Sequence, residues 1–412
     1  MSLIRPFPAL RPAPGRAAEV VAPPYDVLTT EEARVRARGK PYSFLHISKP
    51  EIDLPEGTDP YAAEVYKKAA ENLKAMIAAG VLKQDEAAYY YVYRIQMGAH
   101  VQTGIVAAAS VADYDTNRIR KHEFTRPDKE DDRVRQIDTT NAQTGPVLLA
   151  YPDQPEVDAI LAKTAQASPD SDAVADDGVK HTLWVMRDAV DIARITALFD
   201  AMHALYIADG HHRSASASRI CASRKAANPG HRGAEPYNAF LSVIFPAHEM
   251  RILDYNRVIK DLNGLSEETL LEKIRASFEI TPASGAVKPA RPGQFGLYLA
   301  GKWYQLAIKP ELIPSSDPVG RLDVSLLQNN LIGPVLGITD PRRDKRIDFV
   351  GGIRGLTELE KRVNSGEMAL ALSLHPTRME DLMAVADANE VMPPKSTWFE
   401  PKLADGMASH LL

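Results

Sequence analysis

The chain has 412 residues, of which 45% are hydrophobic and 25% are charged. This composition is typical of a globular protein with a packed core and excludes the disordered and fibrous classes. The formal net charge is -5, from 49 basic and 54 acidic residues, which gives no global field for attracting nucleic acid. The one cysteine, Cys221, permits no intramolecular disulfide.

We expect a cytoplasmic protein. The longest unbroken apolar stretch, residues 87–93, is far short of the roughly 20 residues needed to cross a bilayer. Prolines interrupt the N-terminal sequence MSLIRPFPALRP before a signal-type apolar core forms. At roughly 100–200 residues per domain, the length predicts two or three domains. The motifs described below divide the chain into residues 1–150, 151–290 and 291–412, and we expect these regions to be interleaved in space.

The first predicted elements are short. Residues 19–22 are typical of a buried strand, and the Pro-Pro-Tyr-Asp-Val segment after them is typical of a stiff turn. Thr29 and Glu32 have the spacing of a capping box, which predicts that a helix begins there. The next predicted elements are a helix over residues 61–79 and an antiparallel hairpin formed by residues 89–96 and 101–111.

The remainder of the chain also predicts a mixture of strands and helices. The acidic segment 168–178 predicts a surface loop. Apolar runs predict strands at residues 146–151, 181–187, 205–208, 347–350 and 368–374 and a hairpin over residues 295–308, and helical spacing predicts helices at residues 213–224, 355–363, 379–389 and from Ser266. We therefore expect an α+β fold with ten to twelve strands in mixed, largely antiparallel sheets flanked by helices.

The densest chemical signal is LYIADGHHRS, residues 205–214, where an apolar strand runs directly into a helix. A helix N-terminus offers free backbone N–H groups and the positive end of its dipole. Gly210 lets the backbone come close to a ligand, and the following basic side chains add donors. The segment predicts a cradle for an anionic group such as phosphate, formed by Gly210, His211, His212, Arg213 and Ser214.

Two alternatives for this segment stay open. In the first, Asp209 caps the helix and the histidines make structural hydrogen bonds. In the second, Asp209, His211 and His212 bind a metal ion, although consecutive histidines seldom point at one ion. Anion sites at helix starts are common, which favours the phosphate cradle.

A second polar segment is KHEFT, residues 121–125, with Lys129, Asp132 and Arg133 after it. Mixed charges, a hydroxyl and an imidazole suit the wall of an active site. Lys129 or Arg133 would face phosphate there, while Glu123 or Asp132 would face a metal ion or a substrate amine. A solvated charged helix explains the same residues equally well, because unlike charges recur at a spacing of four residues.

The third segment is MPPKSTWFEPK, residues 392–402, which combines stiff prolines with two lysines, two hydroxyls and two aromatic rings. One interpretation is a segment that closes over a pocket, with Lys395 and Ser396 or Thr397 reaching ligand oxygens. The other is a rigid tail that its aromatic side chains hold against the core.

Four motifs occur in a fixed order along the chain: RPFPALRP with VVAPPYDVL, HEFT with a downstream Lys-x-x-Asp-Arg, ADGHHR, and MPPKSTWFEPKL. They resemble the bacterial and archaeal family called domain of unknown function 1015, and the resemblance runs from Arg5 to about Leu403. The strand-Asp-Gly-His-His-Arg-helix segment also looks like the ligand loop of the ParB and sulfiredoxin superfamily, whose members include free serine kinases and nucleotide-binding partition proteins.

This resemblance implies a nucleotide whose phosphates are held by residues 210–213, with Asp209 near a metal ion or the substrate. In the serine kinases a glutamate activates the serine hydroxyl, and the order of elements makes Glu31 and Glu32 the candidates here. Compact superfamily members place both elements in one small domain, whereas Asp26 and Asp209 are 183 positions apart in this chain. Either a large insertion separates two halves of one site, or the N-terminal element belongs elsewhere.

The resulting hypothesis is a phosphotransferase that passes phosphate from ATP or ADP, with Mg²⁺, to a small hydroxylated metabolite such as free serine. Its cofactor-binding residues would be Gly210, His211, His212, Arg213, Ser214, Lys129, Arg133 and Lys395. Its catalytic candidates are Asp209, His211, Glu32 and Glu123, and Asp209 is also the candidate metal ligand.

Two other classes of function stay open. One is a nucleotide-binding regulatory protein without turnover. The other is a metal-dependent phosphoester hydrolase that uses His122, Glu123, Asp209, His211 and His212. In every case we expect a small-molecule or nucleotide partner, no membrane and no nucleic acid, with a homodimer as an open alternative.

Overall fold

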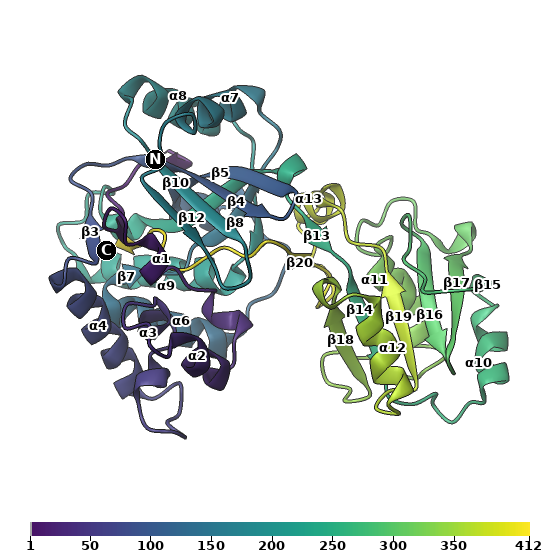
Figure 1. Ribbon diagram of the computed structural model, residues 1–412. Coiled ribbons are helices and arrows are strands. Elements are labelled where there is room, and N and C mark those ends of the chain that lie inside the picture. Colours follow the sequence, from purple (N-terminus) through teal and green to yellow (C-terminus); the bar gives the residue numbers. More distant parts are fainter. Residues whose placement is uncertain (1) are drawn as a thin grey trace. The chain divides into compact units, whose positions relative to one another are not determined.

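The computed structural model describes residues 2–412, and the chain divides into two compact units (Figure 1). The first unit contains the chain as far as Met250 together with Pro401–Leu412, and the second contains Arg251–Glu400. The chain thus leaves the first unit and returns to it for its last twelve residues. The predicted α+β class with largely antiparallel sheets is confirmed. The three-way division by motifs stays a proposal.

The first unit is built on a nine-stranded sheet with the order β6-β11-β8-β12-β5-β4-β10-β9, to which β1 is added beside β5. Its strands pair antiparallel except β11 with β6 and β12 with β8, which pair parallel. The predicted hairpin is present, because β4 and β5 pair directly. The strands are β1 (Ile4–Arg5), β4 (Tyr90–Met97), β5 (His100–Ser110), β6 (Ile119–Arg120), β8 (Val147–Tyr151), β9 (Ser171–Val174), β10 (Lys180–Met186), β11 (Leu205–Asp209) and β12 (Ala239–Pro246).

Helices complete the first unit. Figure 1 shows α7 and α8 together beside the sheet, where apolar side chains of both helices join the main core. The capping box of α2 is confirmed, since Glu32 N–H donates to Thr29 Oγ1 and Thr29 N–H donates to Glu32. The helices are α1 (Ala17–Val20), α2 (Thr30–Ala37), α3 (Leu45–Ser48), α4 (Ala63–Ala78), α5 (Val111–Asp115), α6 (Pro127–Thr140), α7 (Pro155–Thr164), α8 (Ala189–Asp200) and α9 (His211–Ala227), with short 3-10 turns η1 (Tyr25–Val27), η2 (Pro50–Asp53), η3 (Pro236–Asn238) and η4 (Ala247–Glu249).

Two short ribbons tie the ends of the chain into the first unit. β2 (Leu10–Pro12) pairs with β3 (Leu82–Gln84), and β21 (His410–Leu411) pairs with β7 (Ala142–Gln143). A further isolated bridge joins Ala22 to Asp405. The C-terminal segment is therefore held against the N-terminal elements by backbone hydrogen bonds, which fixes the position of Asp405.

The second unit is an antiparallel six-stranded sheet with the order β15-β17-β16-β19-β14-β18. The predicted hairpin of residues 295–308 corresponds to β16 and β17. A two-stranded ribbon, β13 (Ile252–Leu253) with β20 (Trp398–Phe399), also belongs to this unit. The other elements are β14 (Tyr255–Ile259), β15 (Phe278–Ala283), β16 (Gln294–Leu299), β17 (Lys302–Ile308), β18 (Ile347–Gly351), β19 (Leu370–Leu374), α10 (Glu267–Ile274), α11 (Asp323–Leu327), α12 (Leu356–Asn364), α13 (Met379–Asp387), η5 (Pro310–Leu312), the π-turn η6 (Gln328–Ile332) and η7 (Gly352–Arg354).

Three predictions of local structure are wrong. Residues 19–22 do not form a strand, because Ala17–Val20 is the short helix α1. The predicted loop over residues 168–178 contains β9, which pairs with β10 at the edge of the sheet. The described residues contain 21 strands rather than ten to twelve, since many have only two or three residues and leave no periodicity in the sequence. Among residues 2–412, no helix combines the length and apolarity that a membrane span requires.

Candidate functional site

The strand β11 ends at the acidic residue of the ADGHHR motif. Asp209 is its last residue, and the register with β8 shifts between Ile207 and Asp209. Such a bulge inserts one extra residue and re-aims the side chains beside it. The Asp209 carboxylate accepts a hydrogen bond from the Gly210 N–H at 2.8 Å. The predicted junction of strand and helix is therefore present, and the helix begins at His211, two residues before the predicted start.

The N-terminus of α9 has no side-chain cap. Gly210 stands at the N-cap position with φ 97, in the left-handed region that favours glycine. The first backbone N–H groups of a helix have no acceptor within the helix, and the helix dipole places partial positive charge there. The 17-residue helix α9 thus presents uncapped donors at the end of β11. Helix N-termini bind anionic groups in many proteins.

We expect Gly210→Ala to destabilise the protein by about 2 kcal/mol or more, measured by denaturant unfolding. A Cβ at this position would lie 3.2 Å from Arg213 Nε and 3.3 Å from Val147 Cα, in addition to the strain of the positive φ. Gly178→Ala is the matched control, because Gly178 has φ 81 and no heavy atom within 4 Å of its Cβ position. If the two variants lost equal free energy of unfolding, the close contact of the new Cβ with Arg213 and Val147 would contribute nothing.

Arg213 joins the two acidic motifs that are far apart in the sequence. Its Nη2 lies 3.7 Å from Asp26 Oδ2 and 3.7 Å from Asp209 Oδ2. The arginine side chain is only 10% exposed, whereas both carboxylates are about two fifths exposed. The Pro-Pro-Tyr-Asp turn and the ADGHHR turn therefore belong to one site. The intervening residues supply the remainder of the sheet.

These charges interact strongly. Burial favours the neutral form of Asp209, but the positive charges of Arg213 and Lys402 outweigh it and lower the pKa of that carboxyl. Because 3.7 Å is longer than a hydrogen bond, Arg213 Nη2 holds the carboxylates by charge alone. Its Nη1 donates to the Pro146 carbonyl, which fixes the guanidinium. Nη2 therefore keeps the capacity to donate to a ligand oxygen.

His211 connects this site to the HEFT motif. The backbone N–H of His122 donates to His211 Nε2 at 3.4 Å, so Nε2 is an acceptor and the ring proton lies on Nδ1. His211 Nδ1 lies 3.3 Å from Glu123 Oε2, and the Glu123 side chain is 42% exposed. Partial burial opposes ionisation of Glu123, yet the nearby His211 lowers its pKa overall. Glu123 is thus a carboxylate held beside an oriented imidazole.

The other two histidines make contacts within the fold. His212 Nε2 accepts from the backbone N–H of Arg126 at 3.1 Å, and burial lowers its pKa. His122 packs edge-on against His211 with ring centroids 4.5 Å apart, and burial lowers its pKa to about 3. Both rings are therefore neutral near pH 7. Their hydrogen bonds and packing fix the segment that carries Glu123 against the start of α9.

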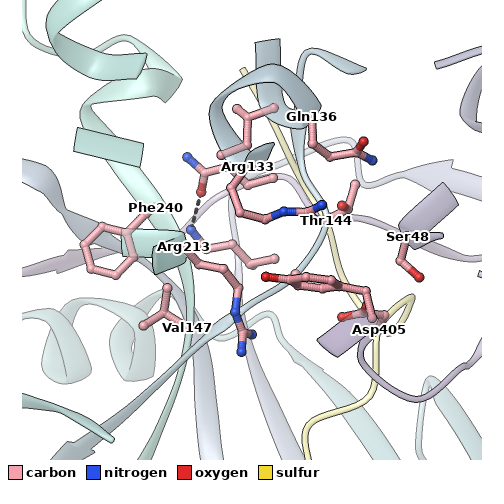
Figure 2. Close-up of a pocket in the computed structure, with 13 residues that line it drawn as sticks. Ser48, Arg133, Gln136, Thr144, Val147, Arg213, Phe240 and Asp405 are labelled. Carbon is pink, nitrogen blue, oxygen red and sulfur yellow. Dashed lines mark hydrogen bonds between the residues drawn. The ribbon is translucent and has the colours of Figure 1, made fainter. Parts of the chain in front are cut away.

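A small pocket lies beside Arg213. Figure 2 shows Arg133, Arg213 and Asp405 among its lining side chains, with Thr144 at the same wall. Its cavity volume is about 30 Å³, which suits a water-sized group rather than a nucleotide. Arg133 stacks 4.0 Å above the Tyr25 ring and donates to Asp132 at 2.7 Å. The complete lining is Tyr25, Ser48, Arg133, Gln136, Ile137, Gln143, Thr144, Gly145, Val147, Arg213, Phe240, Leu241 and Asp405.

Asp405 is the acid that the sequence did not reveal. Asp405 is 2% exposed. Burial raises the pKa of its carboxyl to about 7, although the positive charge of Arg213 opposes this shift. In the sequence it is one member of an Ala-Asp-Gly triplet, the same triplet that precedes the histidines at residues 208–210. The bridge to Ala22 holds this segment beside the pocket.

The raised pKa of Asp405 predicts a pH-dependent stability. The folded state binds this proton more tightly than the unfolded state, whose aspartate pKa is near 3.9. The contribution of Asp405 is therefore complete below about pH 4 and is lost as the pH rises to about 7. We therefore compare the free energy of unfolding of the wild type with that of Asp405→Asn at each pH. The difference, wild type minus variant, should fall by up to about 4 kcal/mol as the pH rises from about 4 to about 7. A pH-independent difference in denaturant unfolding would contradict a raised pKa.

Several predicted residues lie outside this cluster or are engaged elsewhere. Lys129 Nζ donates to the Tyr61 hydroxyl at 2.8 Å on the outer side of α6. Glu32 closes the capping box of α2. Ser214 is fully buried, and its hydroxyl donates to the His211 carbonyl within α9. Lys395 belongs to the second unit. The charged helix α6 has features of both a site wall and a solvated helix. Asp132 is buried, whereas Asp131 pairs with Arg219 at 2.7 Å.

The histidines do not form a metal centre. His211 and His212 accept hydrogen bonds from different backbone N–H groups, so their ring nitrogens do not converge on one point. Among residues 2–412, no three His, Cys, Asp or Glu side chains are grouped as metal ligands. The metal-site alternative for His211 and His212 is therefore wrong. The hydrolase alternative lacks the ligand cluster on which it was based.

Comparison with solved structures gives distant neighbours. A conserved hypothetical protein from Pyrococcus furiosus has 16% identity and a TM-score of 0.36, with 75% of this chain and 95% of that chain covered. A free serine kinase in complex with AMP has 14% identity and a TM-score of 0.35, covering 72% and 86%. SbnI from Staphylococcus aureus, with a C-terminal truncation, has 12% identity and a TM-score of 0.37, covering 74% and 87%.

The sequence comparisons give a clearer result. No curated protein matches the chain. The family model described as "Protein of unknown function (DUF1015)" matches residues 4–325, which is more than three quarters of the chain and includes the PPYD, HEFT and ADGHHR motifs. The family resemblance carried by these motifs is thereby confirmed, and the chain belongs to the DUF1015 family.

Proposed function

We propose that the protein transfers a phosphoryl group from ATP or ADP to the hydroxyl of a small metabolite such as free serine. One observation carries the proposal. Arg213 stands in the first turn of an uncapped helix, with its Nη2 3.7 Å from two partly exposed carboxylates. Helix donors and an arginine bind phosphate, and the carboxylates suit the cation that accompanies a nucleotide.

The charges at this site favour a nucleotide bound with Mg²⁺. Arg213 and Lys402 only balance the charges of Asp26 and Asp209, which leaves no net positive charge for the phosphates of a nucleotide. Mg²⁺ is usually held by one or two carboxylates together with phosphate oxygens and water, so these two side chains fit it. The ion, when bound, would neutralise the charge on the phosphate oxygens. Asp209, with its lowered pKa, is ionised at neutral pH and suited to this role.

Glu123 is the proposed base. Its carboxylate is exposed enough to reach a substrate, and His211 Nδ1, 3.3 Å away, holds its position. In the transfer, Glu123 accepts the proton of the acceptor hydroxyl while the hydroxyl oxygen bonds to the terminal phosphorus. The bond from that phosphorus to the bridging oxygen breaks, and the nucleotide leaves with one phosphate fewer. Arg213 and the N–H groups of α9 stabilise the charge on the transferred group.

The test is phosphorus NMR of the full chain with Mg²⁺, ATP or ADP and a pool of small hydroxyl metabolites that includes L-serine. We expect a new phosphomonoester signal that requires one acceptor and disappears when EDTA replaces Mg²⁺. A tube without acceptor is the control. Nucleotide that binds but stays intact in every tube would replace the proposal by the regulatory alternative. Nucleotide loss without any acceptor would indicate hydrolysis instead.

A further inference from the structure

A tight turn in the second unit carries the part of the C-terminal motif that the proposed function does not use. The turn is Pro393-Pro394-Lys395-Ser396-Thr397, in which Lys395 has a positive φ of 59. Ser396 Oγ donates to the Pro393 carbonyl at 2.6 Å, and Thr377 Oγ1 donates to the Ser396 carbonyl at 2.7 Å. Two proline rings further restrict the backbone. The turn is therefore built rigidly before any ligand arrives.

This turn leaves a row of backbone donors open. Among residues 2–412, no hydrogen bond has the backbone N–H of Lys395, Ser396 or Thr397 as its donor. Successive N–H groups in a turn that includes a left-handed residue form a concavity that binds anions. Lys395 is exposed in the same turn, so its ammonium can reach a ligand there.

A buried positive charge lies directly behind the turn. Arg257 on β14 is 4% exposed, and its Nη2 donates to the Lys395 carbonyl at 3.0 Å. Its Nη1 donates to the Tyr255 carbonyl. No ion pair of the described chain includes Arg257, and burial lowers its pKa to about 10, still charged at neutral pH. A charge buried without a counter-ion is costly, and an anion nearby would offset it.

Aromatic rings pack beside the turn. The Tyr255 ring lies 5.1 Å from Trp398 and 6.0 Å from Phe349, and Lys395 Nζ lies 5.6 Å from the Tyr255 ring centre. The nearby acids are already engaged. Glu400 accepts from Trp398 Nε1 at 2.8 Å, and Asp254 accepts from Asn256 at 2.6 Å. Neither acid pairs with Arg257 or Lys395.

We propose that the second unit binds a phosphate group in the turn 393–397, through the open backbone N–H groups and Lys395, with Arg257 supplying charge from behind. The ligand class is a small phosphate or phosphomonoester, because the oxygens of a tetrahedral oxyanion can accept from several N–H donors of one turn. This inference uses only residues of the second unit and does not rest on the proposed function.

The experiment measures the fluorine NMR signal of Trp398, the tryptophan that directly follows the turn. The chain has three tryptophans, Trp184, Trp303 and Trp398, so the full-length protein labelled with 5-fluorotryptophan gives three fluorine NMR signals, which single Trp→Phe variants assign. Sodium phosphate is titrated at constant ionic strength made up with chloride. We expect a saturable shift of the Trp398 signal, with the Trp303 signal unchanged.

Variants of Lys395 test whether its ammonium group contributes to phosphate binding. Lys395→Gln should raise the half-saturating phosphate concentration about tenfold, equivalent to about 1.4 kcal/mol. Lys395→Arg should stay within about threefold of wild type, because it keeps the charge. Lys345→Gln, an exposed lysine of the same unit, is the matched control and should not change it. A Trp398 signal that does not move, or that saturates equally in Lys395→Gln, would overturn the proposal. Neither result depends on nucleotide binding or turnover.

Discussion

Replacing Arg213 by methionine should weaken ADP binding in the presence of Mg²⁺ by about 100-fold or more, equivalent to about 2.7 kcal/mol. Methionine has a similar length but removes every donor. The loss is large because the guanidinium is buried, held by the Pro146 carbonyl and placed at the uncapped start of α9. Isothermal titration calorimetry measures the change directly. Without this cation, a phosphate would face Asp26 and Asp209 with only Lys402 to offset their charge.

Two further variants separate binding from folding. Arg219→Met removes an arginine farther along the same helix that pairs with Asp131, and it should keep wild-type affinity. Arg213→Lys keeps the charge without the planar fork, so its affinity should lie between wild type and methionine. Because loss of the buried guanidinium leaves Asp26, Asp209 and the Pro146 carbonyl without their partner, each variant is checked by thermal unfolding before titration. Wild-type affinity in a folded Arg213→Met protein would remove the α9 start from the nucleotide site.

Glu123→Gln should lower the turnover rate by about 10²–10⁴-fold while nucleotide affinity stays within about threefold of wild type. The amide cannot accept the proton of the acceptor hydroxyl, but it retains the shape of the carboxylate beside His211. The proposed phosphate donors of α9 are untouched, which is why binding should survive. The phosphomonoester signal measures turnover, and calorimetry measures binding on the same preparation.

Glu32→Gln is the discriminating variant, since the order of elements also made Glu32 a candidate base. Its carboxylate lies 2.8 Å from the Thr29 N–H in the capping box of α2. Glutamine serves in a capping box as well as glutamate, so the variant should fold and turn over near the wild-type rate. Loss of turnover in Glu32→Gln with full activity in Glu123→Gln would transfer the role of base to Glu32.

Local features of the chain were predictable because neighbouring residues decide them. The capping box at Thr29, the hairpin of β4 and β5 and the junction of β11 with α9 all depend on spacing within a few residues. The short segments were not predictable. Residues 17–20 and 171–174 are too short for periodicity to distinguish helix, strand and loop, so tertiary packing decides them.

The sequence by itself determined the family motifs and the α+β class, and it predicted a phosphate cradle at residues 210–213. It identified candidate acidic and basic residues, but it did not show which of them lie together in one site. Only the tertiary structure decided that Asp26 and Asp209 meet at Arg213, that His212 instead holds the Arg126 backbone, and that Asp405 enters the pocket.

The physical reason is that these contacts join segments far apart in the chain. Strand pairing sets which segments become neighbours: β11 lies between β6 and β8, and the bridge from Ala22 to Asp405 brings the two ends of the chain together. Burial then sets the charge states, raising the pKa of Asp405 to about 7 while Arg213 lowers that of Asp209. Both effects depend on which atoms surround a side chain, and sequence spacing carries no information about them.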